Sequence, residues 1–91
     1  MKDFQSELRR LPGWEIVVKN EVPQLRKSYR FKNFAQALAF TNQVGALAEE
    51  YNHHPEIITE WGQVTLSWWT HTAKGLTQND FDMAGKVEAL G

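Results

Sequence analysis

Two adjacent histidines, His53 and His54, lie near the middle of the chain in the stretch "EEYNHHPE". A third histidine, His71, and an aspartate, Asp80, follow further along the sequence. Imidazole titrates close to neutral pH, so each of these rings can donate or accept a proton under ordinary conditions. A neighbouring carboxylate favours the protonated ring and can fix its tautomer, and Glu49 and Asp80 are candidates for that role. The residue types therefore indicate proton transfer, which requires no cofactor.

Other uses of these side chains have to be weighed against acid–base chemistry. A solvated loop explains the histidine pair about equally well, and Asp80 can serve simply as a partner at the start of a helix. A metal site is less favoured, because adjacent side chains seldom converge on one ion and no H-x-x-x-H or H-E-x-x-H spacing occurs. Nucleophilic catalysis is less favoured still, because the chain has no cysteine and no serine in a G-x-S-x-G turn.

A long helix should lead into the histidine pair. Asn33 is a suitable N-cap, with Gln36 three residues later as its partner. Apolar residues then recur at helical spacing, at Phe34, Ala37, Leu38, Thr41, Val44, Leu47, Ala48 and Tyr51. Pro55 disfavours helical geometry in the residue before it, so we expect the helix to end near Asn52 or His53.

The carboxyl end of this helix is a favourable place for a charged imidazole. The helix dipole makes the potential negative there, which favours imidazolium and mildly disfavours Glu49 and Glu50. Glu49 lies four residues before His53, so the two side chains should be within reach if the helix extends that far.

Alternating polar and apolar residues predict four strands. The runs "WEIVVK" and "LRKSYRF", joined by "NEVPQ", indicate an antiparallel hairpin. The runs "EIITE" and "QVTLSWWTH" indicate a second hairpin that turns at Trp61-Gly62. His71 is expected at the end of this last strand, on the face of Trp69 and opposite the apolar face that carries Trp68.

Two more helices complete the predicted fold. "FQSELRRL" is a short helix that should end at Pro12-Gly13, and Thr77 should open a last helix, with Asp80 three residues after the cap. The order of elements is α-β-β-α-β-β-α. Paired strands without βαβ alternation predict an α+β fold, with a four-stranded antiparallel sheet and helices packed on one face. A chain of 91 residues, 1–91, forms a single domain.

Composition excludes several classes of protein. The net charge of −1 and the pI of about 6.3 provide no field that would gather nucleic acid, so the basic residues at 26, 27, 30 and 32 are expected on a solvated strand face. The absence of cysteine excludes disulfides and thiolate sites. No apolar run approaches membrane-spanning length and the N-terminus does not resemble a signal peptide, so we expect a cytoplasmic protein without membrane contact.

The spacing of the candidate site resembles that of a known family. Glu49, then His53-His54-Pro55, then Trp61, His71 and Asp80 reproduce the signature of the pterin-4a-carbinolamine dehydratases. The similarity covers nearly the whole chain, through "LPGW", "YRFKNFAQALAF" and "GLTQNDFDMA", and the family fold has the predicted element order.

Two positions depart from the usual pattern of this family. Asn52 stands where relatives often have Asp, and Trp69 stands where they often have a small hydroxyl residue. Neither change removes an acid–base group, although either could alter how the pterin is held.

The resemblance implies a dehydratase that converts 4a-hydroxytetrahydropterin to quinonoid dihydropterin and water, in the recycling of tetrahydrobiopterin. The implied catalytic residues are His53, His54, His71, Glu49 and Asp80. The implied pterin-binding residues are Asn52, His53, His54, Trp69, Thr70 and His71. No cofactor and no metal are implied.

The resemblance also bears on partners. It implies a homodimer or homotetramer and a metabolic link to an aromatic amino acid hydroxylase. In animals the same fold also serves as a dimerisation partner of a homeodomain transcription factor, and some relatives that lack catalytic histidines act as assembly or regulatory factors. The alternative function is therefore a non-catalytic, dehydratase-like scaffold or regulatory module. Retention of all three histidines favours the enzyme.

Overall fold

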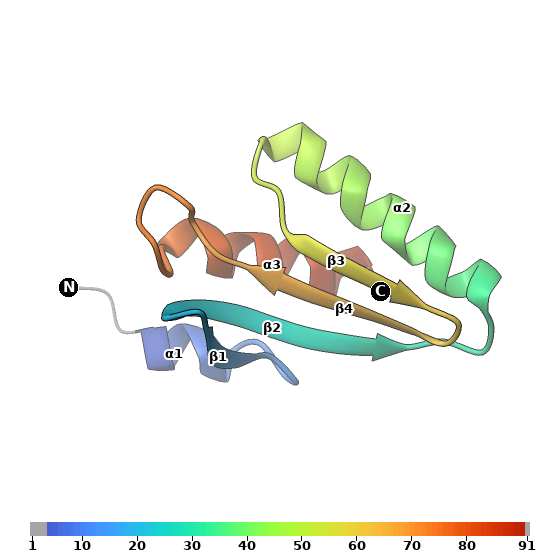
Figure 1. The fold of residues 1–91 in the computed structure, drawn as a ribbon, viewed down its shortest axis with the longest axis horizontal. Coiled ribbons are helices and arrows are strands. Elements are labelled where there is room, and N and C mark those ends of the chain that lie inside the picture. Colours follow the sequence, from blue (N-terminus) through green and yellow to red (C-terminus); the bar gives the residue numbers. More distant parts are fainter. Residues whose placement is uncertain (1–3, 91) are drawn as a thin grey trace.

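The computed structural model describes residues 4–90, which form three helices and a four-stranded antiparallel sheet (Figure 1). The α-β-β-α-β-β-α order predicted from the sequence is confirmed. The sheet order is β1-β2-β4-β3, so the two hairpins meet through β2 and β4 at the centre. The elements are α1 (Phe4–Arg9), β1 (Glu15–Lys19), β2 (Val22–Arg30), α2 (Phe34–Tyr51), β3 (Glu56–Glu60), β4 (Gln63–Trp68) and α3 (Gln78–Leu90).

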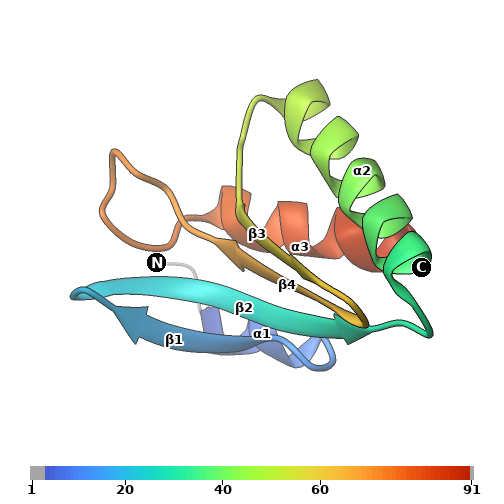
Figure 2. The ribbon, with the colours of Figure 1, turned by 45° about the vertical axis from the view of Figure 1, so that its right-hand side comes forward.

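The strand register separates a core face of the sheet from an open face. Leu25 pairs with Trp68, and Leu66 pairs with Ile57 on its other side. Because these residues alternate along their strands, their side chains share the face on which α2 and α3 lie (Figure 2). The short helix α1 packs against α3, where Phe4 and Phe81 stack with ring centroids 4.7 Å apart. The other face of the sheet carries mostly polar side chains.

The buried apolar residues form one continuous core between the sheet and the helices. Because a single core joins the sheet to both long helices, the ends of these elements are held in fixed relation to one another. No helix within residues 4–90 has both the length and the apolar character needed to cross a membrane. The core residues are Leu11, Trp14, Leu25, Ala37, Phe40, Val44, Ala48, Val64, Leu66, Trp68, Phe81, Met83, Ala84 and Val87.

Helix α2 begins and ends where the sequence indicated. The side chain of Asn33 accepts a hydrogen bond from the backbone N–H of Gln36 at 2.9 Å, which satisfies a free donor at the helix start. At the other end Asn52 adopts a left-handed conformation, with φ of 50°, and caps the helix. This residue turns the chain out of the helix immediately before the histidine pair.

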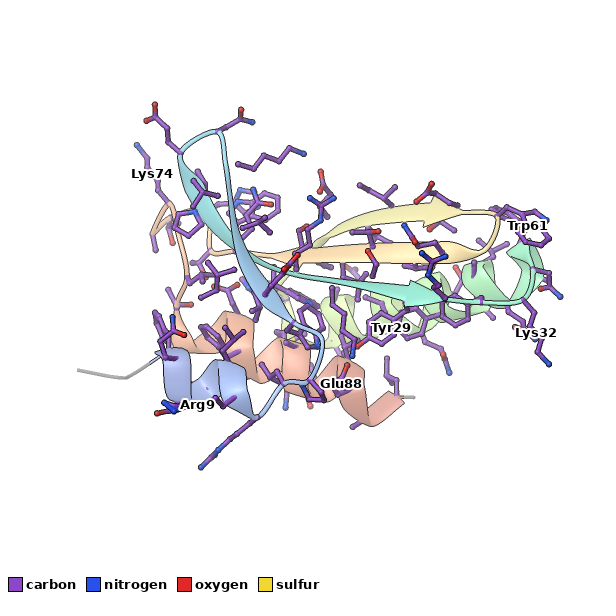
Figure 3. The ribbon with its side chains drawn as sticks, turned by 90° about the horizontal axis from the view of Figure 1, so that it is seen from below. Arg9, Tyr29, Lys32, Trp61, Lys74 and Glu88 are labelled. Carbon is purple, nitrogen blue, oxygen red and sulfur yellow. The ribbon has the colours of Figure 1, made fainter. Side chains whose placement is uncertain are left out.

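A half-buried glutamate ties α3 to the sheet. Glu88 accepts hydrogen bonds from Trp14 Nε1 at 3.1 Å, from Lys27 Nζ at 2.8 Å and from the Tyr29 hydroxyl. Figure 3 shows Tyr29 and Glu88 between the sheet and α3. Burial opposes ionisation of Glu88, but the three donors outweigh it and lower the pKa of this carboxyl. Burial and the adjacent carboxylate raise the pKa of Tyr29.

Two local predictions need correction. Strand β4 ends at Trp68, so His71 lies in the following turn and not at the end of the strand. Strand β2 begins earlier than predicted, at Val22, because the hairpin turn is only Asn20-Glu21, both with positive φ.

Candidate active site

The α2–β3 connection and the loop after β4 lie at one end of the sheet, opposite the Trp61-Gly62 turn (Figures 1 and 3). The antiparallel register requires this arrangement, because β4 ends where its neighbour β3 begins. The start of α3 follows closely after the β4 loop. Three segments that are separate in sequence therefore bring the histidines and Asp80 to the same end of the molecule.

His53 is held by its backbone at the end of α2. Its N–H donates to the carbonyl of Ala48 at 3.1 Å, in the capping pattern produced by the left-handed Asn52. Its ring then lies parallel to the indole of Trp68, with centroids 5.5 Å apart and an interplanar angle of 16°. Because Trp68 is fully buried in the core, it gives the imidazole a rigid support.

His53 and Asp80 form the central contact of the site. His53 Nε2 lies 2.6 Å from Asp80 Oδ1, and the two side chains are 12% and 0% exposed. A carboxylate this deeply buried needs hydrogen-bond donors to remain ionised. An ionised carboxylate is an acceptor only, so a hydrogen bond to one requires the proton to be on His53 Nε2.

The second oxygen of Asp80 is occupied by threonines. Asp80 Oδ2 accepts the backbone N–H of Thr77 at 2.9 Å and the hydroxyl of Thr70 at 2.9 Å. Thr77 immediately precedes α3, so Asp80 lies in the first turn of that helix, where the dipole favours a negative charge. The predicted role of Asp80 at the helix start is therefore confirmed, and the same carboxylate also reaches His53.

Glu49 contacts His54, whereas the sequence had suggested His53. The turn at Asn52 directs the next two side chains differently from a continuing helix, and His54 Nε2 lies against Glu49 Oε2. This pair is open to solvent, with side chains 54% and 77% exposed. Surface pairs of this kind add little to stability.

His71 lies in the turn that follows Thr70 and is exposed. Its ring packs against Trp69, with centroids 4.9 Å apart and an interplanar angle of 46°. The turn is closed by a bridge in which Thr70 N–H donates to the Gly75 carbonyl at 2.8 Å. His71 directly follows Thr70, the residue whose hydroxyl contacts the buried Asp80 carboxylate.

The hollows described on the surface contain none of the histidines. One of about 700 Å³ lies between α1 and α3 and is lined by residues that include Glu7, Arg10 and Lys86. Within residues 4–90 no group of three or more ligand-type side chains is arranged to hold a metal ion.

Two contacts at the site were not anticipated from the sequence. Trp68 was expected only in the core, and no sequence pattern signals that its ring faces His53. Thr70 was expected to line the pterin pocket, and its hydroxyl contacts Asp80. Thr77 with Asp80 three residues later is a recognisable helix-cap pattern in the sequence. That pattern does not indicate that Thr70 also donates a hydrogen bond to Asp80.

The fold and this end of the sheet define an α+β protein with a buried carboxylate–histidine pair suited to acid–base chemistry. Residues 1–90 match the family described as Pterin 4 alpha carbinolamine dehydratase. Relatives in Hahella chejuensis and Syntrophotalea carbinolica, both named "Putative pterin-4-alpha-carbinolamine dehydratase", are 54% and 56% identical over 87 residues. These alignments cover 96% of this chain and 78% and 75% of the relatives. The chain belongs to the pterin-4-alpha-carbinolamine dehydratase family, which is a family of hydro-lyases.

Two solved structures have the same fold. A transcriptional coactivator/pterin dehydratase from Brucella melitensis superimposes with a TM-score of 0.84 at 35% identity, covering 94% of this chain and 89% of that one. A pterin dehydratase-like protein identified as a RuBisCO assembly factor in the alpha-carboxysome gives a TM-score of 0.71 at 29% identity, covering 86% and 88%. The predicted family and fold class are therefore confirmed.

Proposed function

We propose that this protein dehydrates 4a-hydroxytetrahydropterin to quinonoid dihydropterin by histidine acid–base catalysis. The observation that carries the proposal is the contact of His53 Nε2 with the buried Asp80 carboxylate, 2.6 Å away. Family membership supports the substrate class, and the contact is suited to fix the tautomer of a proton-transfer group.

The reaction requires two proton transfers and no change of oxidation state. The bond between C4a and the hydroxyl oxygen breaks, and the oxygen leaves as water after receiving a proton from an acid. The N5–H bond also breaks, with its proton going to a base, and a C4a=N5 double bond forms. Positioned acids and bases each contribute about 10²–10⁴-fold in such reactions.

The ring of His53 is arranged to supply one of these groups. Its Nε2 proton is donated to Asp80, so in the neutral ring Nδ1 carries the free lone pair. The ionised Asp80 stabilises the imidazolium that forms when Nδ1 accepts a proton. In this proposal His53 takes the proton from N5.

The exposed His71 completes the acid–base pair by protonating the departing hydroxyl. His54, oriented by Glu49, polarises the substrate and can replace one partner for the opposite C4a stereoisomer. Asn52 and Trp69, together with Thr70 and the three histidines, line the surface on which the flat pterin binds. The tilted ring of Trp69 beside His71 supplies an aromatic wall for that surface.

A stopped-flow assay of 4a-hydroxytetrahydropterin dehydration tests the function. The wild-type protein should accelerate the reaction well above buffer, and His53→Ala and His71→Ala should each lose about 10²-fold or more of that acceleration. Thermal unfolding of each variant shows whether it remains folded. Wild-type rates in both folded variants would refute the histidine mechanism.

A non-catalytic scaffold or regulatory module is the second candidate. It is favoured by the structural similarity to the RuBisCO assembly factor, which shows that the fold also occurs in a protein named for assembly. A folded wild-type protein that gives no acceleration above buffer would select this candidate over the enzyme.

The wider setting follows from family membership. We infer a single catalytic domain spanning residues 1–91, assembled as a homodimer or homotetramer in the cytoplasm. Its metabolic partner would be an aromatic amino acid hydroxylase, which generates the carbinolamine when it oxidises tetrahydrobiopterin. Light scattering of the purified protein measures the oligomeric state directly.

A further inference from the structure

We propose that Thr70 and Thr77 are positioning residues, which fix the Asp80 carboxylate in the orientation that accepts the Nε2 proton of His53. The catalytic consequence rests on the proposed dehydratase function, whereas the effect on the His53 ring does not. Asp80 is the only link between these threonines and the imidazole that the described hydrogen bonds provide.

Counting protons defines the direction of the network. Each threonine hydroxyl carries one proton, and the hydroxyls of Thr70 and Thr77 lie 2.8 Å apart. Thr70 donates to Asp80 Oδ2 at 2.9 Å, whereas the Thr77 hydroxyl is 3.4 Å from the same oxygen. The shorter contacts are all satisfied if Thr77 donates to Thr70 and Thr70 donates to Asp80.

The carboxylate then has a distinct partner set on each oxygen. Oδ2 receives the Thr70 hydroxyl and the Thr77 backbone N–H, and Oδ1 is left for His53. These donors come from the β4 loop and the start of α3, and His53 comes from the end of α2. The network therefore sets the rotation of the Asp80 carboxylate from two directions.

The loop that carries Thr70 is itself fixed. Thr70 and Gly75 exchange backbone hydrogen bonds, at 2.8 Å from the Thr70 N–H and 3.4 Å to the Thr70 carbonyl. Thr70 is therefore held by its backbone while its side chain points to Asp80. A hydroxyl held in this way limits the motion of the carboxylate at little further cost in side-chain entropy.

Removing the Thr70 hydroxyl leaves Oδ2 with the Thr77 N–H and the more distant Thr77 hydroxyl, 3.4 Å away. The carboxylate can then rotate, and its oxygens no longer present a single acceptor to His53. The ring would populate both neutral tautomers, and only the one protonated at Nε2 leaves Nδ1 free as a base. Turnover should therefore fall, and the same loss should follow from a change at Thr77, which is not among the residues of the proposed pterin surface.

The chain of hydrogen bonds from Thr77 through Thr70 and Asp80 to His53 is called the relay below. Four variants test it: Thr70→Val, Thr70→Ser, Thr77→Val and Thr77→Ser. Valine keeps the shape but removes the hydroxyl, and serine keeps the hydroxyl. Thr41→Val is the matched control, because it removes a part-buried threonine–threonine contact of 2.6 Å, to Thr59, that lies between α2 and β3. Thermal unfolding confirms that each variant is folded.

The first readout is steady-state dehydration. Thr70→Val should lower kcat about tenfold, and Thr77→Val, which acts through Thr70 and lies outside the proposed pterin surface, should lower it about threefold with KM nearly unchanged. Both serine variants should restore kcat to within about twofold of the wild type. A Thr70→Val kcat equal to that of the wild type, or an equal loss in Thr41→Val, would overturn the proposal.

The second readout is the tautomer of His53, measured by long-range ¹H–¹⁵N NMR of the neutral rings, with the His53→Gln spectrum assigning the signal. The wild type should show a single form protonated at Nε2, and Thr70→Val a mixture. An unchanged single tautomer in Thr70→Val would refute the relay. If the wild type proves inactive, the proposed function fails, but the NMR result still decides the relay.

Discussion

Replacing Asp80 by asparagine should abolish most of the activity by reversing the tautomer of His53. The Asp80 oxygen that faces Thr77 accepts a backbone N–H, which cannot change its direction. The asparagine carbonyl oxygen must therefore take this position, and the amide NH₂ group then faces His53 Nε2. Two donors would oppose each other, so the His53 proton moves to Nδ1 and the free base is lost.

The expected size of the effect follows from the groups involved. Loss of a positioned base lowers kcat by about 10²–10⁴-fold. The two donors on Oδ2 would change from charge-assisted to neutral hydrogen bonds, at a cost of about 1 kcal/mol each. Asp80→Asn should therefore be destabilised by about 2 kcal/mol and yet remain folded.

Stopped-flow dehydration and urea unfolding measure the two effects separately. Asp82→Asn is the matched control, because it alters an exposed carboxylate in the same helix that contacts only Gln78 among the described hydrogen bonds. Its kcat should match that of the wild type. A folded Asp80→Asn variant with kcat within about threefold of the wild type would refute the reasoning about the tautomer.

Two further predictions concern stability. Folding lowers the pKa of Glu88 from its ordinary value of about 4.5. The ionised side chain therefore stabilises the fold at pH values above 4.5, and this stabilisation is lost as the pH falls through the lowered pKa of the folded state. Glu88→Gln should therefore lower the unfolding free energy at pH 7 by about 2 kcal/mol in urea titrations. The variant should also lose less unfolding free energy than the wild type when the pH is lowered, and an unchanged pH dependence would contradict this. Asn52→Ala should cost about 1 kcal/mol in thermal unfolding, because the position is left-handed, and Asn52→Gly should cost less; equal melting temperatures would contradict the strain argument.

The sequence was sufficient to predict the elements whose ends carry strong local signals. Asn33 and Pro55 mark the limits of α2, and both limits are confirmed. The alternation of Val64, Leu66 and Trp68 identified the core face of β4. Each of these signals depends on interactions between residues near in sequence, which is why no knowledge of the tertiary structure was needed.

The partners within the site could not be predicted in the same way. Spacing along a helix suggested that Glu49 reaches His53, but the left-handed Asn52 gives this contact to His54. The contact of His53 with Asp80 and the stacking on Trp68 join segments distant in sequence. Such contacts depend on how α2 and α3 pack on the sheet, which a local pattern does not encode.

The most direct test of the central claim is the single-turnover rate of 4a-hydroxytetrahydropterin dehydration with His53→Gln beside the wild type. Glutamine can still donate a hydrogen bond to Asp80, but it cannot accept a proton near neutral pH. We expect a folded variant whose rate is lower by about 10²-fold or more. A rate close to that of the wild type would show that His53 transfers no proton, and would contradict the mechanism.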